Sequence, residues 1–263
     1  MSTEQKNDAV RVEKLPGHIA VVTIDRPEAR NAVNGAVAAG LEAAVDATEA
    51  DDDIWVVVLT GAGPDAFCAG ADLKEVSAGR GSALSTERGG FAGFVYRERS
   101  KPWIAAVNGK ALAGGTELTL ACDLVVAAEH AAFGLPEVLR GLIAAAGGLY
   151  RLPRAIPPNI ALELILTAGQ LDAQRAHQLG WVNRVVPAAE LRDAALALAA
   201  QITRNAPTAV RESLQVARMA NELDEAALRT LTRAAFQRVA ASEDFREGPR
   251  AFIEKRAPQW TGR

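Results

Sequence analysis

The stretch "ALAGGTELTLACD" at residues 111–123 places the carboxylate Glu117 shortly after a Gly-Gly pair, inside an otherwise apolar run. The strand-like sequence "KPWIAAVNG" (101–109) precedes it, and a second, "DLVVAAE" (123–129), follows it. Continuous apolar runs of this length predict strands that are buried on both faces. Strand-like runs separated by helical stretches indicate β/α crossovers, and the class expected is therefore α/β.

The region before this stretch repeats the alternation. Residues 10–27 predict two strands joined at Pro16-Gly17. A helix with Asn34 as its N-cap is expected next, and the run "DIWVVVLTG" (53–61) predicts another buried strand. Beyond Tyr150 the pattern becomes mostly helical, with "LGWVNRVVP" as the one late strand candidate. The helical stretches expected there are 158–168, 188–205, 207–221, 224–242 and 244–256.

Composition narrows the class of protein. The chain has 263 residues, 49% of them hydrophobic, and its net charge of −3 comes from 29 basic and 32 acidic residues. This balance lacks the basic footprint of a nucleic-acid or anionic-membrane binder. Two cysteines make no disulfide framework, the N-terminus lacks the apolar core of a signal peptide, and no run is long enough to span a membrane. A cytoplasmic protein is expected.

Several motifs are better explained by a structural role than by a catalytic or binding function. The sequence "GAGPDA" (61–66) resembles a dinucleotide fingerprint, but Pro64 and Asp65 predict a turn where the fingerprint needs a helix. The three histidines are widely separated, so no metal site is expected. Cys68 and Cys122 lie in apolar surroundings and are expected to be buried small hydrophobes. No G-x-S-x-G elbow is present.

Two glycine-bearing loops, "AFCAGADLKE" (66–75) and "ALAGGTELTLACD", each lead from a strand into a helical start. Main-chain N–H groups from both loops could converge on one oxygen and form an oxyanion hole, and the second donor would lie at a helix N-terminus. The alternative is that the glycines only turn the chain. The spacing favours neither explanation.

Glu117 has two explanations of its own. It is either a first-turn carboxylate placed favourably on the helix dipole, or a general base beside the oxyanion hole. Twenty residues later "FGLPEVLRG" supplies Glu137 in another mostly apolar loop. Two carboxylates in one pocket could hold a water and move its protons. A pair of ordinary salt bridges is the alternative.

These residues together resemble the crotonase family, the enoyl-CoA hydratase/isomerase superfamily, from about residue 10 to the C-terminus. The order and spacing of the motifs make the resemblance specific. The motifs are "RPEARNAV", "AFCAGADLKE", "KPWIAAVNGKALAGGTELTLACDLVVAAEHAAFGLPEV", "LDAQRAHQLGWVNRVVP" and "REGPRAFIEKRAP".

The resemblance implies a spiral of ββα units with a C-terminal helical trimerisation region. It divides the chain into a flexible tail (1–9), a ββα core (10–200) and a C-terminal helical region (201–263) for oligomerisation and active-site cover. A homotrimer or a dimer of trimers is implied. No metal or redox cofactor is implied, because coenzyme A arrives as part of the acyl-CoA substrate.

The resemblance also assigns site residues. The two N–H groups of the oxyanion hole match Ala69 and Gly114, and the two glutamates of the hydratase subgroup match Glu117 and Glu137. Glu117 would deprotonate a water, and Glu137 would supply a proton to the α-carbon of a trans-2-enoyl-CoA. The segment that contacts coenzyme A matches Ala69, Gly70, Ala71 and Asp72.

The implied activity is enoyl-CoA hydration to a 3-hydroxyacyl-CoA, as in fatty-acid β-oxidation or a related acyl-CoA pathway. A double-bond isomerase or another acyl-CoA lyase on the same scaffold is the nearest alternative, and a non-catalytic RNA-binding relative is a different one. The sequence departs from the family pattern at Ala113, where a third glycine is frequent, and at Ala144-Ala145, where Pro-Gly is common.

Overall fold

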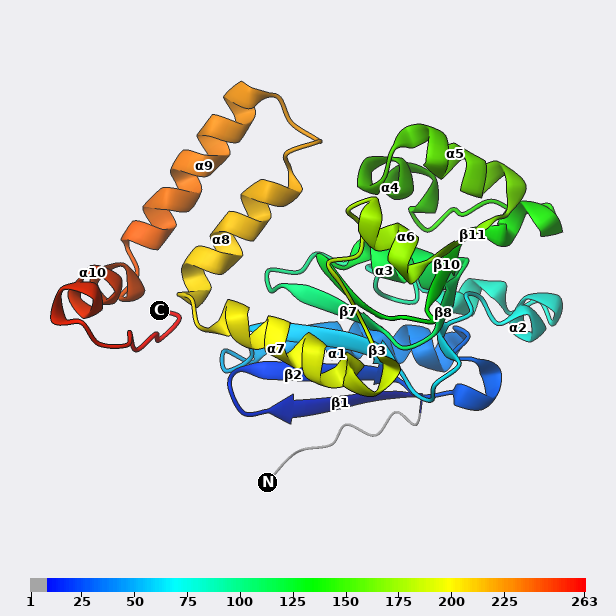
Figure 1. The fold of residues 1–263 in the computed structure, drawn as a ribbon, viewed down its shortest axis with the longest axis horizontal. Helices are drawn as coiled ribbons and strands as arrows, with labels where there is room; N and C mark the ends of the chain where they lie inside the picture. Colours follow the sequence, from blue (N-terminus) through cyan, green and yellow to red (C-terminus); the bar gives the residue numbers. More distant parts are fainter. Residues whose placement is uncertain (1–8) are drawn as a thin grey trace.

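The computed structural model describes residues 9–263 and shows a twisted sheet flanked by helices, with a helical arm at its C-terminal end (Figure 1). The larger sheet has six strands in the order β1-β2-β3-β7-β9-β12, and every pair except the β1–β2 hairpin is parallel. Parallel strands need crossovers, which the intervening helices provide. The strands are Val10–Leu15, Ile19–Ile24, Val56–Gly61, Trp103–Val107, Leu124–Ala128 and Arg184–Val186.

A second sheet of four short strands lies beside the first, in the order β11-β10-β8-β4. Each of its strands is only three residues long, and for this reason periodicity in the sequence did not reveal them. A separate two-stranded ribbon, β5–β6, follows α2. The bounds are β4 Ala66–Cys68, β5 Ser85–Thr86, β6 Gly90–Phe91, β8 Lys110–Leu112, β10 Ala132–Gly134 and β11 Gln170–Asp172.

The helices of the body cover both faces of this framework. The predicted first helix is confirmed as α1, and the side chain of Asn34 accepts a hydrogen bond from the Val37 N–H as its cap. One face of α1 is apolar and buried, including Val37, Leu41 and Val45. The bounds are α1 Gly35–Ala50, α2 Leu73–Ser77, α3 Gly114–Ala121, α4 Gly148–Ala155, α5 Pro158–Thr167, α6 Ala173–Gln178 and α7 Leu191–Thr203.

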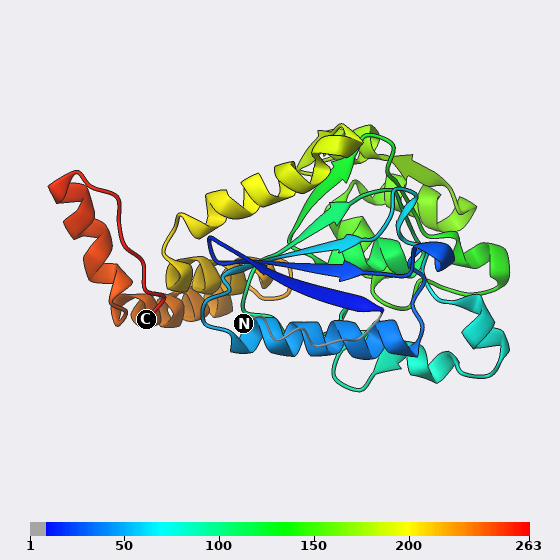
Figure 2. The same ribbon diagram turned by 90° about the horizontal axis from the view of Figure 1, so that it is seen from below.

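The last three helices form an arm that projects from the body (Figures 1 and 2). They are α8 Pro207–Arg218, α9 Glu225–Ala240 and α10 Asp244–Glu254, close to the predicted stretches. The Arg218 guanidinium holds the arm to the body through two hydrogen bonds of 2.8 Å to the Asp123 carboxylate. The arm is therefore joined to the chain segment that begins β9.

The N-terminal boundary differs slightly from the prediction. Residues 1–8 of the expected tail lie outside the described residues. Ala9 is buried, and its carbonyl accepts a hydrogen bond from the Asp25 N–H. Ala9, which the prediction placed in the tail, is therefore packed against the body.

Candidate active site

Glu117 lies in the first turn of α3, where the sequence placed it. The residue is only 3% exposed, and its Oε1 atom accepts a hydrogen bond of 2.9 Å from the N–H of Gly148. Gly148 begins α4, so two helix N-termini face the same carboxylate. Their dipoles partly offset the cost of burying the charge.

The glycines before Glu117 are required by close packing. A Cβ atom on Gly115 would lie 1.9 Å from the carbonyl oxygen of Cys68, and one on Gly114 would lie 2.3 Å from the Phe91 ring. The preceding residue, Ala113, has φ 51° and ψ −125°, a backbone conformation that normally requires glycine. The loop therefore approaches its neighbours at main-chain distance and carries strain at Ala113.

The other loop corrects one sequence-based expectation. The Ala69 N–H donates a hydrogen bond of 3.0 Å to the carbonyl oxygen of Arg30, so it is not free to bind a substrate oxygen. The Gly70 N–H contacts Cys68 Sγ at 3.4 Å, and the Asp72 N–H donates to the carbonyl oxygen of Val33. The assignment of Ala69 as an oxyanion-hole donor is wrong on this point.

Within the segment 69–72, Ala71 is the residue whose N–H has no acceptor among residues 9–263. Ala71 pairs with Val33 as in a parallel sheet, and that pairing uses the Gly70 carbonyl and the Asp72 N–H. Because successive groups of an extended chain point to opposite sides, the Ala71 N–H points away from Val33. The loop also lies against α3, since a Cβ atom on Gly70 would be 3.1 Å from the Gly114 nitrogen.

Polar contacts with neighbouring segments hold the loop that contains Ala71 (66–75) in place. The guanidinium of Arg26 contacts the Asp72 carboxylate at 3.1 Å, and the same carboxylate caps α2 by accepting from the Lys74 N–H. The buried Asn31 side chain donates to the carbonyl oxygens of Ala62 and Ala66. The Asp72 side chain is thus engaged within the protein, and a substrate contact from this segment would come from its main chain.

Glu137 lies in the 3-10 helix η3 (Pro136–Arg140), behind the proline noted in the sequence. Its side chain is partly buried, and one carboxylate oxygen, Oε2, is inaccessible to solvent and has no hydrogen-bond partner. A buried polar atom without a partner is costly, and among the five such side-chain atoms of residues 9–263 this one is the only carboxylate oxygen. This atom is free to bind a ligand or a water.

Both glutamates have raised pKa values. Burial raises the pKa of Glu117 to about 7, and the negative charge of Glu137 adds to this effect, whereas the Gly148 N–H opposes it. Burial also raises the pKa of Glu137 above its usual range. Because the charge of Glu137 contributes to the raised pKa of Glu117, the two carboxylates lie in the same region of the molecule.

The alternative of two ordinary salt bridges is not supported. No Lys, Arg or His nitrogen within residues 9–263 lies within 4.0 Å of either carboxylate. A buried carboxylate with a raised pKa and no cationic partner is poised to exchange a proton near neutral pH. The arrangement can therefore perform general acid–base chemistry beside two free main-chain donors.

The motifs set aside in the sequence have structural roles. Residues 62–65 of "GAGPDA" form a bend that leads into β4, and no helix begins there. Burial raises the thiol pKa of both Cys68 and Cys122 to about 12, so neither is a ready nucleophile.

Over the described part of the chain, no group of three His, Cys, Asp or Glu side chains could hold a metal ion. The helices of residues 9–263 include none long and apolar enough to cross a membrane.

Sequence reasoning missed three residues around Glu117. The N–H of Gly148 donates a hydrogen bond to the Glu117 carboxylate. The side chains of Tyr96 and Arg151 donate hydrogen bonds to carbonyl oxygens of the turn that precedes Gly148. Gly148 could have been suspected from the "AAAGG" run at 144–148. No feature of the sequence marked Tyr96, because its hydrogen bond joins residues that are 49 positions apart in the chain.

Comparison with known proteins agrees with this geometry. The Enoyl-CoA hydratase/isomerase family model matches residues 14–263, and this chain belongs to that family.

Its relatives are hydratases and dehydratases of acyl-CoA by name. The chain is 40% identical over 252 residues to a carnitinyl-CoA dehydratase from Proteus mirabilis, covering 94% of this chain and 96% of the relative. It is 41% identical over 247 residues to a mevalonyl-coenzyme A hydratase from Aspergillus fumigatus, covering 92% and 91%. The crystal structure of an enoyl-CoA hydratase from Mycobacterium tuberculosis H37Rv matches with a TM-score of 0.93 and 46% identity, over 97% of this chain and 99% of that one. The crotonase-like fold is thereby confirmed.

Proposed function

We propose that this protein is an enoyl-CoA hydratase that adds water across the 2,3 double bond of a trans-2-enoyl-CoA to give a 3-hydroxyacyl-CoA. The observation that carries the proposal is the pair of glutamates, the buried Glu117 and the partly buried Glu137, both with raised pKa values and neither with an ion-pair partner among residues 9–263. Family membership and the hydratase names of the relatives support it.

In the proposed mechanism the thioester oxygen accepts hydrogen bonds from the N–H groups of Ala71 and Gly114. Both groups come from loops held at main-chain distance by glycines, and the second lies at the N-terminus of α3. Two such donors stabilise the negative charge that develops on the oxygen as the β-carbon is attacked. This polarisation makes the β-carbon electrophilic.

Glu117 acts as the base and Glu137 as the acid in the same proposal. The partnerless Oε2 atom of Glu137 and the second oxygen of Glu117 hold the attacking water between them. Glu117 takes a proton from this water as its oxygen bonds to the β-carbon, and Glu137 delivers a proton to the α-carbon. The two carboxylates exchange protons with solvent afterwards. We expect no metal or redox cofactor to take part.

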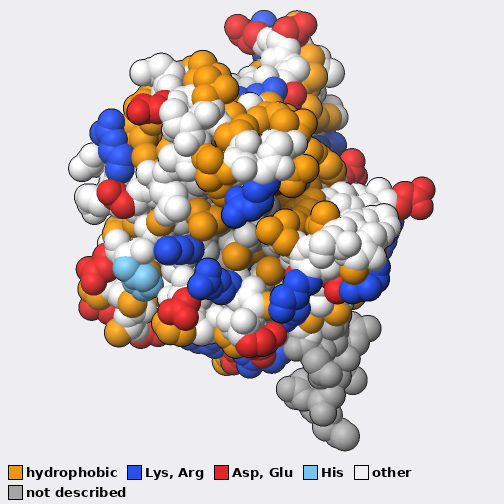
Figure 3. Space-filling model, turned by 90° about the vertical axis from the view of Figure 1, so that its right-hand side faces the viewer, with side chains coloured by type: hydrophobic (Ala, Val, Ile, Leu, Met, Phe, Trp, Pro, Cys, Tyr) orange, Lys and Arg blue, Asp and Glu red, His pale blue; other side chains and the backbone are white. Residues whose placement is uncertain are grey.

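The surface supports an amphipathic substrate. On the face of the molecule at the right of Figure 1, hydrophobic side chains gather between Lys and Arg side chains (Figure 3). Large apolar side chains are exposed on and near the elements of the site, namely Leu73, Val76, Leu139, Leu142, Ile143, Leu162 and Leu166. An acyl chain and a phosphate-bearing coenzyme A would meet complementary surfaces there.

The helical arm supports assembly into a trimer or a dimer of trimers. Phe236, Phe245, Phe252 and Ile253 are all exposed on α9 and α10, and Phe252 is 85% exposed. Apolar side chains gathered on a projecting arm suit contact with a second copy of the chain. Light scattering at micromolar protein should report a trimer or larger, and a monomer would contradict this part of the proposal.

A spectrophotometric hydration assay across enoyl-CoA substrates tests the proposed function. Acyl groups of increasing length should be compared with polar ones, including crotonobetainyl-type and hydroxylated chains, because the relatives' names differ in the acyl group. We expect loss of the enoyl thioester absorbance without added metal and in the presence of a chelator. Movement of the double bond without addition of water would instead indicate an isomerase.

A further inference from the structure

The turn at residues 145–148 supplies main-chain hydrogen bonding to Glu117: the Gly148 N–H donates a hydrogen bond of 2.9 Å to Oε1, and the main chain of Ala146 also lowers the pKa of the carboxyl. The turn is tightly packed: a Cβ atom on Gly148 would lie 3.1 Å from Glu117 Oε1 and 2.9 Å from the Ala144 Cβ. Gly147 adopts φ 109°, which favours glycine. The position of the Glu117 carboxylate thus depends on the position of this turn.

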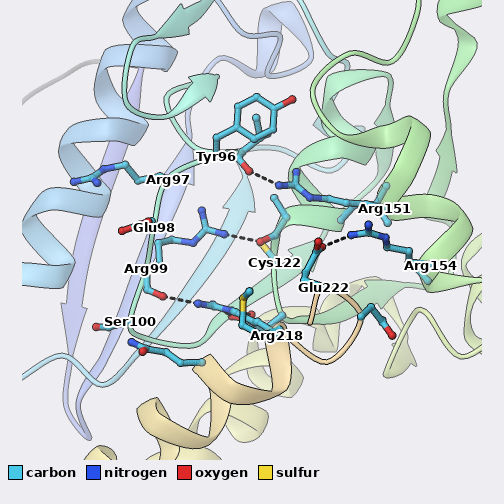
Figure 4. A pocket seen from close by; sticks show the side chains of 18 of the residues that line it. Tyr96, Arg97, Glu98, Arg99, Ser100, Cys122, Arg151, Arg154, Arg218 and Glu222 are labelled. Carbon is cyan, nitrogen blue, oxygen red and sulfur yellow. Dashed lines mark hydrogen bonds and ion pairs between the residues drawn. The ribbon is translucent and has the colours of Figure 1, made fainter. Parts of the chain in front are cut away.

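Arg151 ties the turn to a distant segment. Its guanidinium donates a hydrogen bond of 2.6 Å to the carbonyl oxygen of Val95, next to Tyr96 (Figure 4). The same guanidinium donates a hydrogen bond of 3.3 Å to the carbonyl oxygen of Ala146. A Cβ atom on Gly147 would lie 2.5 Å from Arg151 Nη1, which places the guanidinium directly on the turn. Arg151 forms no salt bridge with any described carboxylate. Its charge is therefore available to act on Glu117.

Tyr96 also connects the Val95–Tyr96 segment to the 145–148 turn. Its hydroxyl donates a hydrogen bond of 2.8 Å to the carbonyl oxygen of Ala145. The guanidinium of Arg151 lies 5.6 Å from the centre of the Tyr96 ring and 5.5 Å from that of Tyr150. The Val95–Tyr96 segment and the turn are thus joined by three hydrogen bonds next to the catalytic glutamate.

We propose that Arg151 and Tyr96 are positioning residues: they lock the 145–148 turn so that its Gly148 N–H orients Glu117, and the Arg151 charge favours the ionised base. This inference rests on the proposed role of Glu117. Neither residue needs to touch the substrate. The arrangement lets a base that is nearly inaccessible to water keep a proton affinity suited to neutral pH.

The charged and titratable groups that face Glu117 have opposing effects. Glu137 on η3 raises the pKa of Glu117, and Arg151 on α4 lowers it. Tyr96, from the segment before β7, is close enough for its own pKa to respond to Glu117. Removal of the Arg151 charge leaves Glu137 without an opposing charge, so the base should become harder to ionise.

The test compares Arg151→Gln, Arg151→Lys and Tyr96→Phe with the wild type in pH profiles of kcat and kcat/KM. We expect Arg151→Gln to move the acidic limb to higher pH, so that the loss in kcat/KM is about tenfold larger at pH 6 than at pH 8.5. Arg151→Lys should return the acidic limb to its wild-type pH but should not restore the full kcat, because an ammonium group cannot hold both carbonyl oxygens. Tyr96→Phe should lower kcat by a few fold without moving the limb. KM should change by less than about threefold in all three.

Arg154→Gln is the matched control, because Arg154 lies on the same helix but pairs with Glu222. It should leave the pH profile unchanged. A direct titration of the Glu117 carboxyl by difference infrared spectroscopy, assigned with Glu117→Gln, needs no turnover. If the wild type hydrates no enoyl-CoA, the proposed function fails while this titration still tests the inference. An unchanged Glu117 titration in Arg151→Gln, with only a lower melting temperature, would overturn it.

Discussion

Glutamates in the body and in the helical arm have opposite environments. Glu117 is buried in the body without an ion pair, and its pKa is raised to about 7. Glu247 on α10 is held by the Arg256 guanidinium, and this pairing lowers its pKa to about 2. The first carboxylate can accept and release protons near neutral pH, whereas the second stays charged and organises the end of the arm. Local solvation thus gives the body a carboxylate suited to proton transfer and gives the arm one suited to a permanent ion pair.

Replacement of Glu117 should have the largest effect. Glu117→Gln keeps the size of the side chain but removes the base, and kcat should fall by about 10² to 10⁴. In the double mutant with Glu137→Gln, the losses should be less than additive because both groups act on one water. Affinity for a substrate analogue should change little, since main-chain donors hold the thioester.

Glu247→Gln is the matched control in the arm. It should leave kcat per assembled molecule within about twofold of the wild type, because general acid–base catalysis involves only groups that reach the substrate. Comparable kcat losses in the two variants would remove the distinction between body and arm.

The two carboxylates should also have opposite effects on stability as pH changes. The pKa of Glu117 is higher in the folded than in the unfolded chain, so its stabilising contribution is complete below about pH 4.5 and is lost as pH rises through about 7. Glu117→Gln should therefore stabilise the protein at pH 8, by on the order of 2 kcal/mol.

Glu247 has a lowered pKa, so its contribution is present above about pH 4.5 and is lost as pH falls toward 2. Glu247→Gln should thus lower the melting temperature at pH 8 slightly, if at all. Thermal unfolding of both variants at pH 5 and pH 8 tests the signs. A Glu117→Gln protein that is less stable at pH 8 would contradict the assignment of a raised pKa.

The junction between body and arm should contribute less to the free energy of unfolding than the change expected for Glu117→Gln. Arg218→Gln removes both hydrogen bonds to the partly buried Asp123 and should cost about 1–2 kcal/mol. Arg250→Gln breaks an exposed pair with Glu254 and should cost less than about 0.5 kcal/mol. Chemical denaturation and light scattering would show whether Arg218 also supports assembly. Equal losses in the two variants would mean that the junction is no stronger than an exposed pair.

Relief of backbone strain should change stability less than loss of the Arg218 junction. Ala113→Gly should stabilise the body by about 1 kcal/mol, because φ 51° with ψ −125° is unfavourable for alanine. Ala168 has φ 56° and ψ 30°, the ordinary left-handed conformation at the end of α5, so Ala168→Gly should gain less. Denaturation midpoints compare the two. A larger gain at Ala168 would show that the strain lies outside the site.

Local patterns predicted much of this molecule from sequence. The buried strands, the Asn34 cap and the arm helices each depend on residues adjacent in the chain. The loop that contains Ala69 and Ala71 was located correctly, but the choice of donor depends on pairing with Val33, a contact between distant segments. Gly70 between them has φ 91°, which turns the chain so that the two N–H groups meet different surroundings, and the sequence could not show which of the two alanines lies free.

The environment of Glu117 was unpredictable for the same reason. Gly148, Tyr96 and Arg151 reach it only after α4 packs beside α3. The sequence singled out Glu117 and Glu137 as candidates, because ionisable residues in apolar runs are unusual, and the family resemblance assigned their roles. It could not indicate which N–H groups and charges surround them.

The central claim is that two carboxylates act on one water, and kcat of Glu137→Gln on a trans-2-enoyl-CoA tests it most directly. The variant keeps the volume of the side chain but cannot deliver a proton from a carboxyl group. The account predicts folded protein with normal substrate-analogue affinity and a kcat lower by at least about 10². A Glu137→Gln enzyme that retains wild-type kcat, beside an inactive Glu117→Gln, would contradict it and would indicate a one-base isomerase.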